Sequence, residues 1–298
     1  MKKEVIIITG GTGFIGSHLV RRMKQDCYPL LIFLHRRGVC SLDNEIEIYQ
    51  IPENLAELQA VFETYKVLGI IHLATNFQPS HTCDQIPGMI SSNIEFGTIL
   101  LDCAYRAGVS FFINIGTYWQ HYNGEKYNPV NLYAATKQAF EDILKFYVEA
   151  RGISAINLTI FDTYGAKDIR NKIINKLYEI SNTGENLDMS YGEQMIDLIY
   201  ITDIIDGYIT SINIMEKNEV KMEKYCLNSD TPKKLKDVVK IFEKVNNTKT
   251  NINWGKRPYR EREVMETYKA GKRLPNWYPK YTLEAGLQEI RNIMEENF

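Results

Sequence analysis

The sequence predicts an α/β fold in which helices cover both faces of a doubly wound parallel sheet. Short β-branched or apolar runs recur along the chain, as in Val5–Ile8, Leu30–Leu34 and Phe111–Thr117, and such runs suit strands that are buried on both faces. Amphipathic helical patterns separate these runs. The first run also leads directly into a glycine-rich turn. Alternation of strand and helix signals is typical of a parallel sheet.

The glycine-rich turn has the sequence TGGTGFIG at residues 9–16, between the first strand and an amphipathic helix. Its glycines stand three residues apart. Small residues at such a turn let backbone N–H groups and the helix N-terminus approach a pyrophosphate. The sequence therefore predicts a dinucleotide site whose contacts come from this turn: Gly10, Thr12, Gly13, Phe14, Ile15 and Gly16.

The second strand, Leu30–Leu34, is followed by His35, Arg36 and Arg37. A dinucleotide without a 2′-phosphate is usually held by an acidic residue at this strand end. Arginine instead pairs bidentately with phosphate. We therefore predict NADP(H), held by these three residues, rather than NAD(H); the alternative is that the arginines are ordinary solvated loop residues.

The next segments continue the alternation. A strand is expected near 45–51, a helix near 55–65 and a buried strand at 69–75 that ends in small residues. Backbone at such an end can pass close to the cofactor. The contacts expected there are Leu73, Ala74 and Thr75.

The loop at 76–88 is long for a simple connection. It lies on the same sheet edge as the glycine turn, so we expect it to cover the nicotinamide and the substrate. A helix over 90–107 follows, with Asn93 near its start.

The strand at 111–117 ends in Thr117, at the edge where ligands bind in open parallel sheets. A threonine there either donates a hydrogen bond to a substrate oxygen or caps the strand. Tyr118, Trp119 and Gln120 follow in an aromatic and polar loop that suits a sugar ring, and loop packing is the equal alternative.

Tyr133 and Lys137 open a helix that ends near Gly152. Residues four apart on a helix lie on one face. A lysine ammonium beside a tyrosine lowers the tyrosine pKa, which is ordinarily about 10, and so makes the hydroxyl a usable acid or base. On this spacing alone, a solvated surface pair is the commoner explanation.

Composition excludes several functions. A net charge of −2 gives no electrostatic case for nucleic acid or an anionic membrane. The five cysteines are scattered and lack a CxxC pair, and the five histidines show no ligand spacing. We therefore expect no metal site and a cytoplasmic protein with reduced cysteines. The apolar run at Val5–Ile8 is too short for a signal peptide or a membrane helix.

Taken together, the ordered motifs resemble the extended short-chain dehydrogenase/reductases that act on nucleotide sugars. The resemblance rests on TGGTGFIG, His72–Ala74, Asn93, Thr117, YAATK at 133–137, FDTYG at 161–165, and the stretches 192–203 and 277–287. It implies a Rossmann-type NADP-binding domain at 1–165, to which 197–222 returns. It also implies a smaller C-terminal α/β lobe for the nucleotide sugar, formed by 166–196 and 223–298.

The resemblance further implies roles for individual residues. Thr117, Tyr133 and Lys137 would be the catalytic triad, and Asn93, Lys137, Phe161 and Thr163 would contact the cofactor. The family often dimerises through its Tyr–Lys helix and the preceding helix. A homodimer through about 90–107 and 133–150 is therefore expected.

Three positions depart from the family pattern. Sugar 4,6-dehydratases usually carry an Asp-Glu pair where this chain has Tyr118-Trp119, so dehydration is disfavoured. The family's asparagine before the TYG element is Asp162, and its arginine before Asp197, often a diphosphate ligand, is Ile196. The expected substrate residues are Tyr118, Trp119, Gln120, Asp162 and Tyr200, with Arg170, Lys172, Arg260 or Arg262 as replacements for the missing arginine.

The pattern is most similar to the CDP-abequose and CDP-paratose synthases, which are NADPH-dependent 4-ketoreductases. The resemblance implies reduction of the C4 ketone of a nucleotide-linked, most simply CDP-linked, 4-keto-6-deoxyhexose in deoxysugar or O-antigen biosynthesis. Two alternatives stay open: a nucleotide-sugar 4-epimerase, and a non-catalytic NADP-binding sensor or scaffold.

Overall fold

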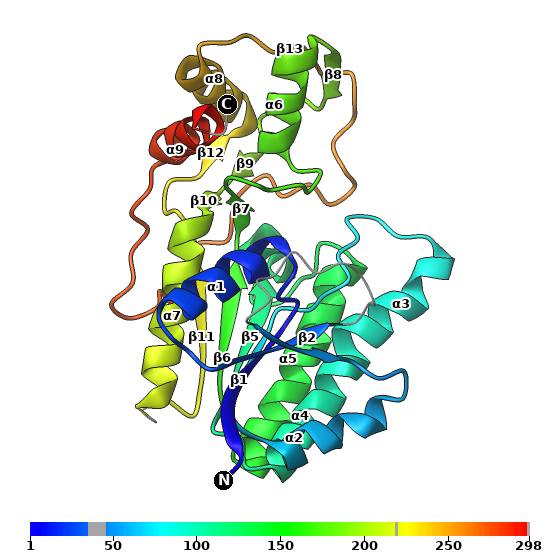
Figure 1. Ribbon diagram of the computed structural model, residues 1–298. Helices are drawn as coiled ribbons and strands as arrows, with labels where there is room; N and C mark the ends of the chain where they lie inside the picture. The colour runs from blue at the N-terminus through cyan, green and yellow to red at the C-terminus, as the bar shows by residue number, and fades with distance from the viewer. Residues whose placement is uncertain (35–45, 218–219, 297–298) are drawn as a thin grey trace.

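A computed structural model describes residues 1–34, 46–217 and 220–296. His35, Arg36 and Arg37 lie outside these residues. A parallel sheet with helices on both faces forms the larger part of the molecule, and a smaller group of helices and short strands lies beyond one end of it (Figure 1). The predicted Rossmann-type doubly wound fold is confirmed.

The central sheet has seven parallel strands in the order β3-β2-β1-β4-β5-β6-β11. Their bounds are β1 Lys3–Thr9, β2 Leu30–Leu34, β3 Glu47–Gln50, β4 Tyr65–His72, β5 Phe111–Thr117, β6 Ser154–Ile160 and β11 Met222–Leu227. The direction of winding reverses between β1 and β4. Ligands of open α/β sheets bind beyond the carboxyl ends of the strands at such a reversal.

Helices cover the two faces of the sheet and enclose two apolar cores (Figure 1). One face carries α1 Phe14–Gln25 and α7 Ile201–Glu216, and the other carries α2 Gln59–Thr64, α4 Phe96–Arg106 and α5 Leu132–Arg151. The alternation within β1 explains this division: Ile6 and Ile8 pack in one core, whereas Val5 and Ile7 pack in the other.

The helix before β5 is longer than predicted. It begins as α3 Ile86–Ile90, passes through one π-helical turn at Ser91–Glu95 and continues as α4. Asn93 lies within the π-helical turn. π-Helical turns are rare in proteins, but those that occur lie frequently at functional sites.

The smaller lobe is built on three two-stranded sheets. β7 Asp162–Tyr164 pairs with β10 Leu198–Tyr200, β9 Met195–Ile196 with β12 Lys233–Lys234, and β8 Asn186–Met189 with β13 Asn251–Trp254. Its helices are α6 Ile173–Thr183, α8 Leu235–Asn246 and α9 Leu283–Glu295.

Several predicted boundaries change. β11 extends the central sheet through Leu227, so the division at residue 222 cuts a strand that pairs with β6. The region 55–65 holds a 3-10 turn, η1 Leu55–Leu58, and then α2, and Tyr65 already belongs to β4. The segment 182–191, which is polar and contains a glycine, includes β8. Helix α7 begins at Ile201.

Candidate active site

The glycine turn leaves β1 in a conformation that requires glycine. Gly10 has φ +70°, and a Cβ there would lie 2.7 Å from the backbone nitrogen of Ala74. A Cβ on Gly16 would lie 2.1 Å from the carbonyl oxygen of Gly10. The N–H of Gly13 donates to that carbonyl (3.0 Å) and Gly13 caps α1, whose first turn has no acidic side chain. The turn thus leaves the N-terminus of α1 open to an anionic group.

The end of β4 is tied to the end of β1. Thr9 Oγ1 accepts from the N–H of Ala74 (3.1 Å) and lies 2.8 Å from His72 Nδ1, and the N–H of Leu73 donates to the carbonyl of Thr9. Thr75 follows and is exposed. The predicted contacts at residues 73–75 and in the glycine turn therefore line one edge of the sheet.

The Asn93 side chain is engaged in hydrogen bonds within the protein. It is buried, and its amide oxygen accepts from Thr75 Oγ1 (3.1 Å) and the N–H of Asn76 (2.7 Å). Its amide nitrogen donates to the carbonyl of Asn76 and to Thr136 Oγ1 (3.0 Å). Because both ends of its amide are bound within the protein, Asn93 joins the loop after β4 to α5, and its expected contact with the cofactor stays a prediction.

Tyr133 and Lys137 lie on the buried face of α5. The side chain of Asn131 caps this helix by accepting from the N–H of Ala134 (3.0 Å), which fixes the start of the helix one turn before Lys137. Tyr133 is 8% exposed and Lys137 is 1% exposed. The pair is therefore not a solvated surface pair.

Burial dominates the protonation of both groups. It raises the pKa of Tyr133 to about 12, against a lowering effect of a hydrogen bond with Thr75. It lowers the pKa of Lys137 to about 7, against a raising effect of Glu141. The expected lowering of the Tyr133 pKa by Lys137 is not seen, because desolvation is the largest influence on this hydroxyl and Thr75 is the group that opposes it. Tyr133 is consequently protonated at neutral pH, as a proton donor must be.

Thr117 ends β5 and begins a 3-10 turn, η4 Tyr118–Gln120. Its Oγ1 accepts from the N–H of Trp119 (3.3 Å), which is the capping role, and the hydrogen bond from Thr117 to a substrate oxygen stays a prediction. Gln120 is fully buried and points away from the cavity toward Gln138 and Glu141. Both ends of the Gln120 amide are bound by protein, so the structure gives no support to the predicted contact of Gln120 with substrate.

Phe161 and Asp162 hold the other side of Tyr118. The rings of Tyr118 and Phe161 are stacked with centroids 4.8 Å apart, and the Tyr118 hydroxyl donates to Asp162 Oδ2 (2.6 Å). Asp162 Oδ1 lies 3.5 Å from Lys172 Nζ. Burial and the Asp162 charge raise the pKa of Tyr118. Tyr118 is therefore a neutral donor in a fixed orientation.

Two predicted substrate residues lie elsewhere. Arg170 is bound to both oxygens of Asp168 and to the carbonyl and hydroxyl of Thr163, and its guanidinium lies 4.2 Å from the Phe14 ring centroid. Arg170 therefore packs against Phe14 at the end of the glycine turn, and its hydrogen bond engages the Thr163 hydroxyl. Tyr200 is buried between the rings of Tyr164 and Tyr281, because it belongs to the core of the smaller lobe.

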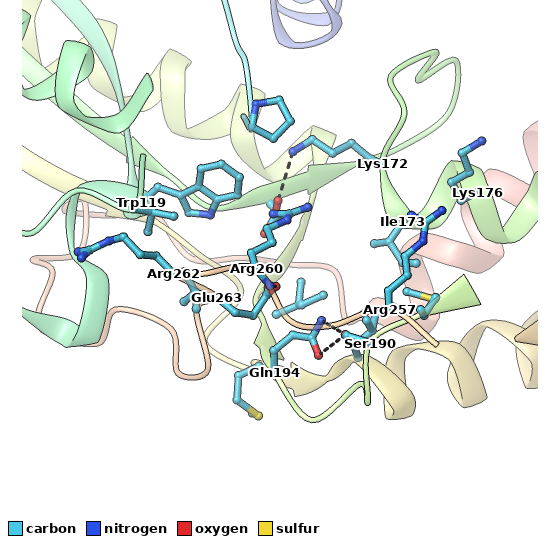
Figure 2. Close-up of a pocket in the computed structure, with 18 of the residues that line it drawn as sticks. Trp119, Lys172, Ile173, Lys176, Ser190, Gln194, Arg257, Arg260, Arg262 and Glu263 are labelled. Carbon is cyan, nitrogen blue, oxygen red and sulfur yellow. Dashed lines mark hydrogen bonds and ion pairs between the residues drawn. The ribbon is translucent and has the colours of Figure 1, made fainter. Parts of the chain in front are cut away.

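A cavity of about 710 Å³ opens between the sheet edge and the smaller lobe. Figure 2 shows Trp119, Lys172 and Arg260 bordering the same hollow. The Arg260 guanidinium lies 5.8 Å from the Trp119 ring centroid. Ile196 is also in the wall, so no arginine from that position enters the cavity.

Three further wall residues were missed by the sequence reasoning. Phe77 lies in the loop that was expected to cover the site, with its ring centroid 4.9 Å from that of Tyr133 and 5.7 Å from that of Trp119. Lys176 comes from α6 and Arg257 from the segment after β13, and both border the cavity (Figure 2). Arg257 stands three residues before Arg260 in a cationic segment, which was the one available signal.

Comparison with known proteins identifies the family. The sequence profile of the NAD dependent epimerase/dehydratase family matches residues 6–222. The chain belongs to this family. Its relatives include the CDP-abequose synthase of Salmonella muenchen, 25% identical over 97% of this chain and 98% of the relative, and that of Yersinia pseudotuberculosis, 27% identical over 87% and 90%.

Solved structures of low sequence identity share the fold of this epimerase/dehydratase family member. The UDP-glucose 4-epimerase of Thermotoga maritima, determined with UDP-glucose, gives a TM-score of 0.84 at 20% identity and covers 98% of this chain and 99% of that one. The corresponding enzyme of Thermus thermophilus, in complex with NAD, gives 0.82 at 17% identity, with 96% and 99% covered.

The residues of this family member fit a nicotinamide dinucleotide. Gly10 and Gly16 make room where side chains would collide, and the open N-terminus of α1 faces the same edge as Tyr133 and Lys137. Within the described ranges, no cluster of three or more His, Cys, Asp or Glu side chains could hold a metal ion. None of the helices described is long and apolar enough to cross a membrane.

Proposed function

We propose that this protein reduces the C4 ketone of a nucleotide-linked, most simply CDP-linked, 4-keto-6-deoxyhexose with NADPH. The proposal rests on the side chains that surround Tyr133. The ring of Phe77 packs against Tyr133 in one contact and against Trp119 in another, and the two positions after Thr117 hold no carboxylate. Such a wall suits the apolar edge of a deoxysugar and lacks the acid–base pair needed to remove water.

Each catalytic side chain has a separate task. When bound, the reduced dinucleotide supplies the hydride. Tyr133 donates its proton to the developing alkoxide, and Thr117 donates a hydrogen bond to the same oxygen, where charge develops in the transition state. Lys137 in its ammonium form stabilises the tyrosinate left behind and holds the ribose next to the nicotinamide.

The cationic side of the cavity would hold the nucleotide diphosphate in place of the arginine that Ile196 replaces. Arg257, Arg260, Lys172 and Lys176 come from two segments of the smaller lobe and border one cavity. Cations distributed around a cavity suit a doubly charged diphosphate.

A panel of sugar nucleotides tests the proposal. Purified protein should oxidise NADPH stoichiometrically with a CDP-linked 4-keto-6-deoxy sugar, and less rapidly with the dTDP-, GDP- and UDP-linked analogues. NMR of the product should show a new C4 hydroxyl. If no sugar nucleotide of the panel caused oxidation of NADPH, the proposed reduction would be ruled out.

A 4-epimerase is the alternative within the same fold. It would hold NAD tightly and would interconvert two sugar nucleotides without net consumption of NADPH. Protein purified with bound NAD, active without added cofactor, would establish the epimerase instead. A non-catalytic NADP-binding sensor or scaffold would bind cofactor and show no sugar-dependent oxidation at all.

Arg36→Ala should raise KM for NADPH by about 10- to 100-fold, because a lost charge-assisted contact to phosphate costs roughly 1.5–3 kcal/mol. KM for NADH should not change, since NADH has no 2′-phosphate. Steady-state kinetics with both cofactors measures this. Arg21→Ala, on the exposed face of α1, is the matched control. Equal use of NADH and NADPH, unaffected by Arg36→Ala, contradicts the NADP(H) assignment.

We also propose that the chain forms a cytoplasmic homodimer through α4 and α5. Three large apolar side chains are exposed there or on the preceding α3: Phe146 (51%), Ile90 (39%) and Tyr105 (37%). Light scattering should report twice the chain mass of 34.5 kDa. Phe146→Glu should shift the equilibrium toward monomer, whereas a monomeric wild-type protein at micromolar concentration would contradict the interface.

A further inference from the structure

Glu141 is a buried carboxylate in α5 that the mechanism above does not use. It stands four residues after Lys137, which itself stands four after Tyr133, so the three side chains share one helix face. Glu141 is 9% exposed. Buried carboxylates are rare unless they are paired, and the partners of this one lead directly to the active site.

Side chains from three other segments donate to the Glu141 carboxylate. Gln120 Nε2 of η4 lies 2.9 Å away, Asn157 Nδ2 of β6 lies 3.2 Å away and Lys224 Nζ of β11 lies 3.0 Å away. The carboxylate therefore joins α5 to two strands of the central sheet and to the turn that follows β5.

One of these contacts continues to Thr117. Gln120 Oε1 accepts from the backbone N–H of Thr117 (2.9 Å), while its amide nitrogen donates to Glu141. A Cβ on Gly116 would lie 3.0 Å from Gln120 Oε1 and 2.9 Å from Asn157 Nδ2. Glycine at 116 thus makes room for both amides. Because Glu141 accepts only, it determines which way the Gln120 amide faces and hence what holds the Thr117 backbone.

Glu141 also stands one helical turn from Lys137 on α5, and among the described residues it is the group that raises the Lys137 pKa against burial. The titratable groups that face Lys137 and Glu141 from the described elements are His72 on β4, Tyr133 on α5, Lys224 and Cys226 on β11, and His121 and Tyr268 in loops. The histidine pKa values are lowered and the tyrosine and cysteine pKa values are raised, so these groups are neutral near pH 7. Among the described groups, Glu141 is left as the charge that acts on Lys137, and Lys224 is the cation that pairs with Glu141.

We propose that Glu141 is a positioning residue of the active site, which holds the Thr117 strand end through Gln120 and supplies the negative charge that faces Lys137. The part that concerns turnover rests on the proposed ketone reduction. The part that concerns the charge of Lys137 does not, and can be measured without substrate.

Glu141→Gln keeps the size of the side chain and an oxygen acceptor but removes the charge. NMR titration of the full-length protein with ¹³C- and ¹⁵N-labelled lysine reports Lys137, whose signal is assigned by its loss in Lys137→Met. The Lys137 pKa should fall by about one unit in Glu141→Gln, because a nearby opposite charge is lost. Lys224→Met should shift it upward, since Glu141 then acts on Lys137 without a competing cation.

The matched control is Glu149→Gln, the same change on the exposed side of the same helix, where Glu149 pairs with Lys221 at 2.9 Å. It should leave the Lys137 titration unchanged. A purely structural role for Glu141 cannot produce shifts of opposite sign in Glu141→Gln and Lys224→Met. Should Glu141→Gln not fold, Lys224→Met alone decides, because an unchanged or downward shift in that variant overturns the proposal.

Kinetics tests the remaining part. Above neutral pH, the loss of kcat as Lys137 deprotonates should move to lower pH in Glu141→Gln and to higher pH in Lys224→Met, with little change in KM for the sugar nucleotide. Absence of turnover with every sugar nucleotide would reject the reduction and leave the NMR result standing. If Glu141→Gln kept normal turnover and its kcat fell at the same pH as that of the wild type, the role of Glu141 would be rejected.

Discussion

Tyr133→Phe is expected to lower kcat for NADPH-dependent reduction by about 10²- to 10⁴-fold, which is the usual contribution of a positioned general acid. Burial raises the pKa of Tyr133 to about 12, so the wild-type hydroxyl is protonated throughout the neutral range and is ready to donate. Phenylalanine keeps the ring that packs against Phe77 and removes only the proton donor. Cofactor affinity should therefore persist.

Rapid mixing with NADPH and the keto sugar measures the loss, and fluorescence titration measures cofactor binding. Tyr208→Phe is the matched control: Tyr208 is fully buried on α7 and its hydroxyl has no hydrogen-bond partner among the described residues. That variant should keep normal turnover and should be no less stable, because it removes an unsatisfied buried group. Near-normal turnover in Tyr133→Phe would remove Tyr133 from the mechanism.

Lys137→Met should abolish most turnover and yet make the protein more stable at pH 7, by up to about 4 kcal/mol. Lys137 is 1% exposed, and burial lowers its pKa from 10.5 to about 7. Folding therefore has to desolvate an ammonium or release its proton. Methionine of similar length avoids this cost, and Glu141 keeps Lys224 as its partner.

The pH dependence of this gain follows from the two pKa values. Between about pH 7 and 10.5 the unfolded chain binds the Lys137 proton and the folded protein does not, so wild-type stability rises with pH across this range. The advantage of Lys137→Met should accordingly be greatest at pH 7 and below, and should shrink toward pH 10. Chemical denaturation at pH 7, 8.5 and 10 measures it.

Lys145→Met is the control for this comparison, since Lys145 is exposed on the same helix. Its effect on stability should be small and independent of pH over the same range. A Lys137→Met protein that is less stable than wild type at pH 7 would show that Lys137 makes a net favourable contribution to the fold.

Local signals were sufficient for the parts of the site that are contiguous in the chain. The glycine turn was predictable because a strand, three spaced glycines and a helix stand in one stretch, and the backbone there has little choice of conformation: Gly10 has φ +70°. Tyr133 and Lys137 were predictable as a pair because helical spacing alone places them on one face. Whether that face is buried was not a local property.

Residue type alone did not predict which polar or aromatic side chains already have partners within the protein. Gln120, Arg170 and Tyr200 are residue types that suit a sugar nucleotide. In the structure, however, Gln120 is hydrogen-bonded to Glu141, Arg170 is hydrogen-bonded to Asp168, and Tyr200 packs against Tyr281. Asp168 is two residues from Arg170, but the other two partners stand 21 and 81 positions away. Phe77 was missed for the same reason, because its contact with Tyr133 crosses from one loop to another element.

The sequence by itself determined the strand–turn–helix unit, the strand-end Thr117 and the Tyr133–Lys137 spacing, because each depends on backbone geometry within a few residues. Only the tertiary structure decided which face of α5 is desolvated, which cations border the cavity and which polar groups are already paired. Those properties depend on burial and on hydrogen bonds between distant segments. They turn Tyr133 into a protonated donor, leave Lys137 close to losing its proton at neutral pH and tie Glu141, one turn further along the same helix, to the strand end at Thr117.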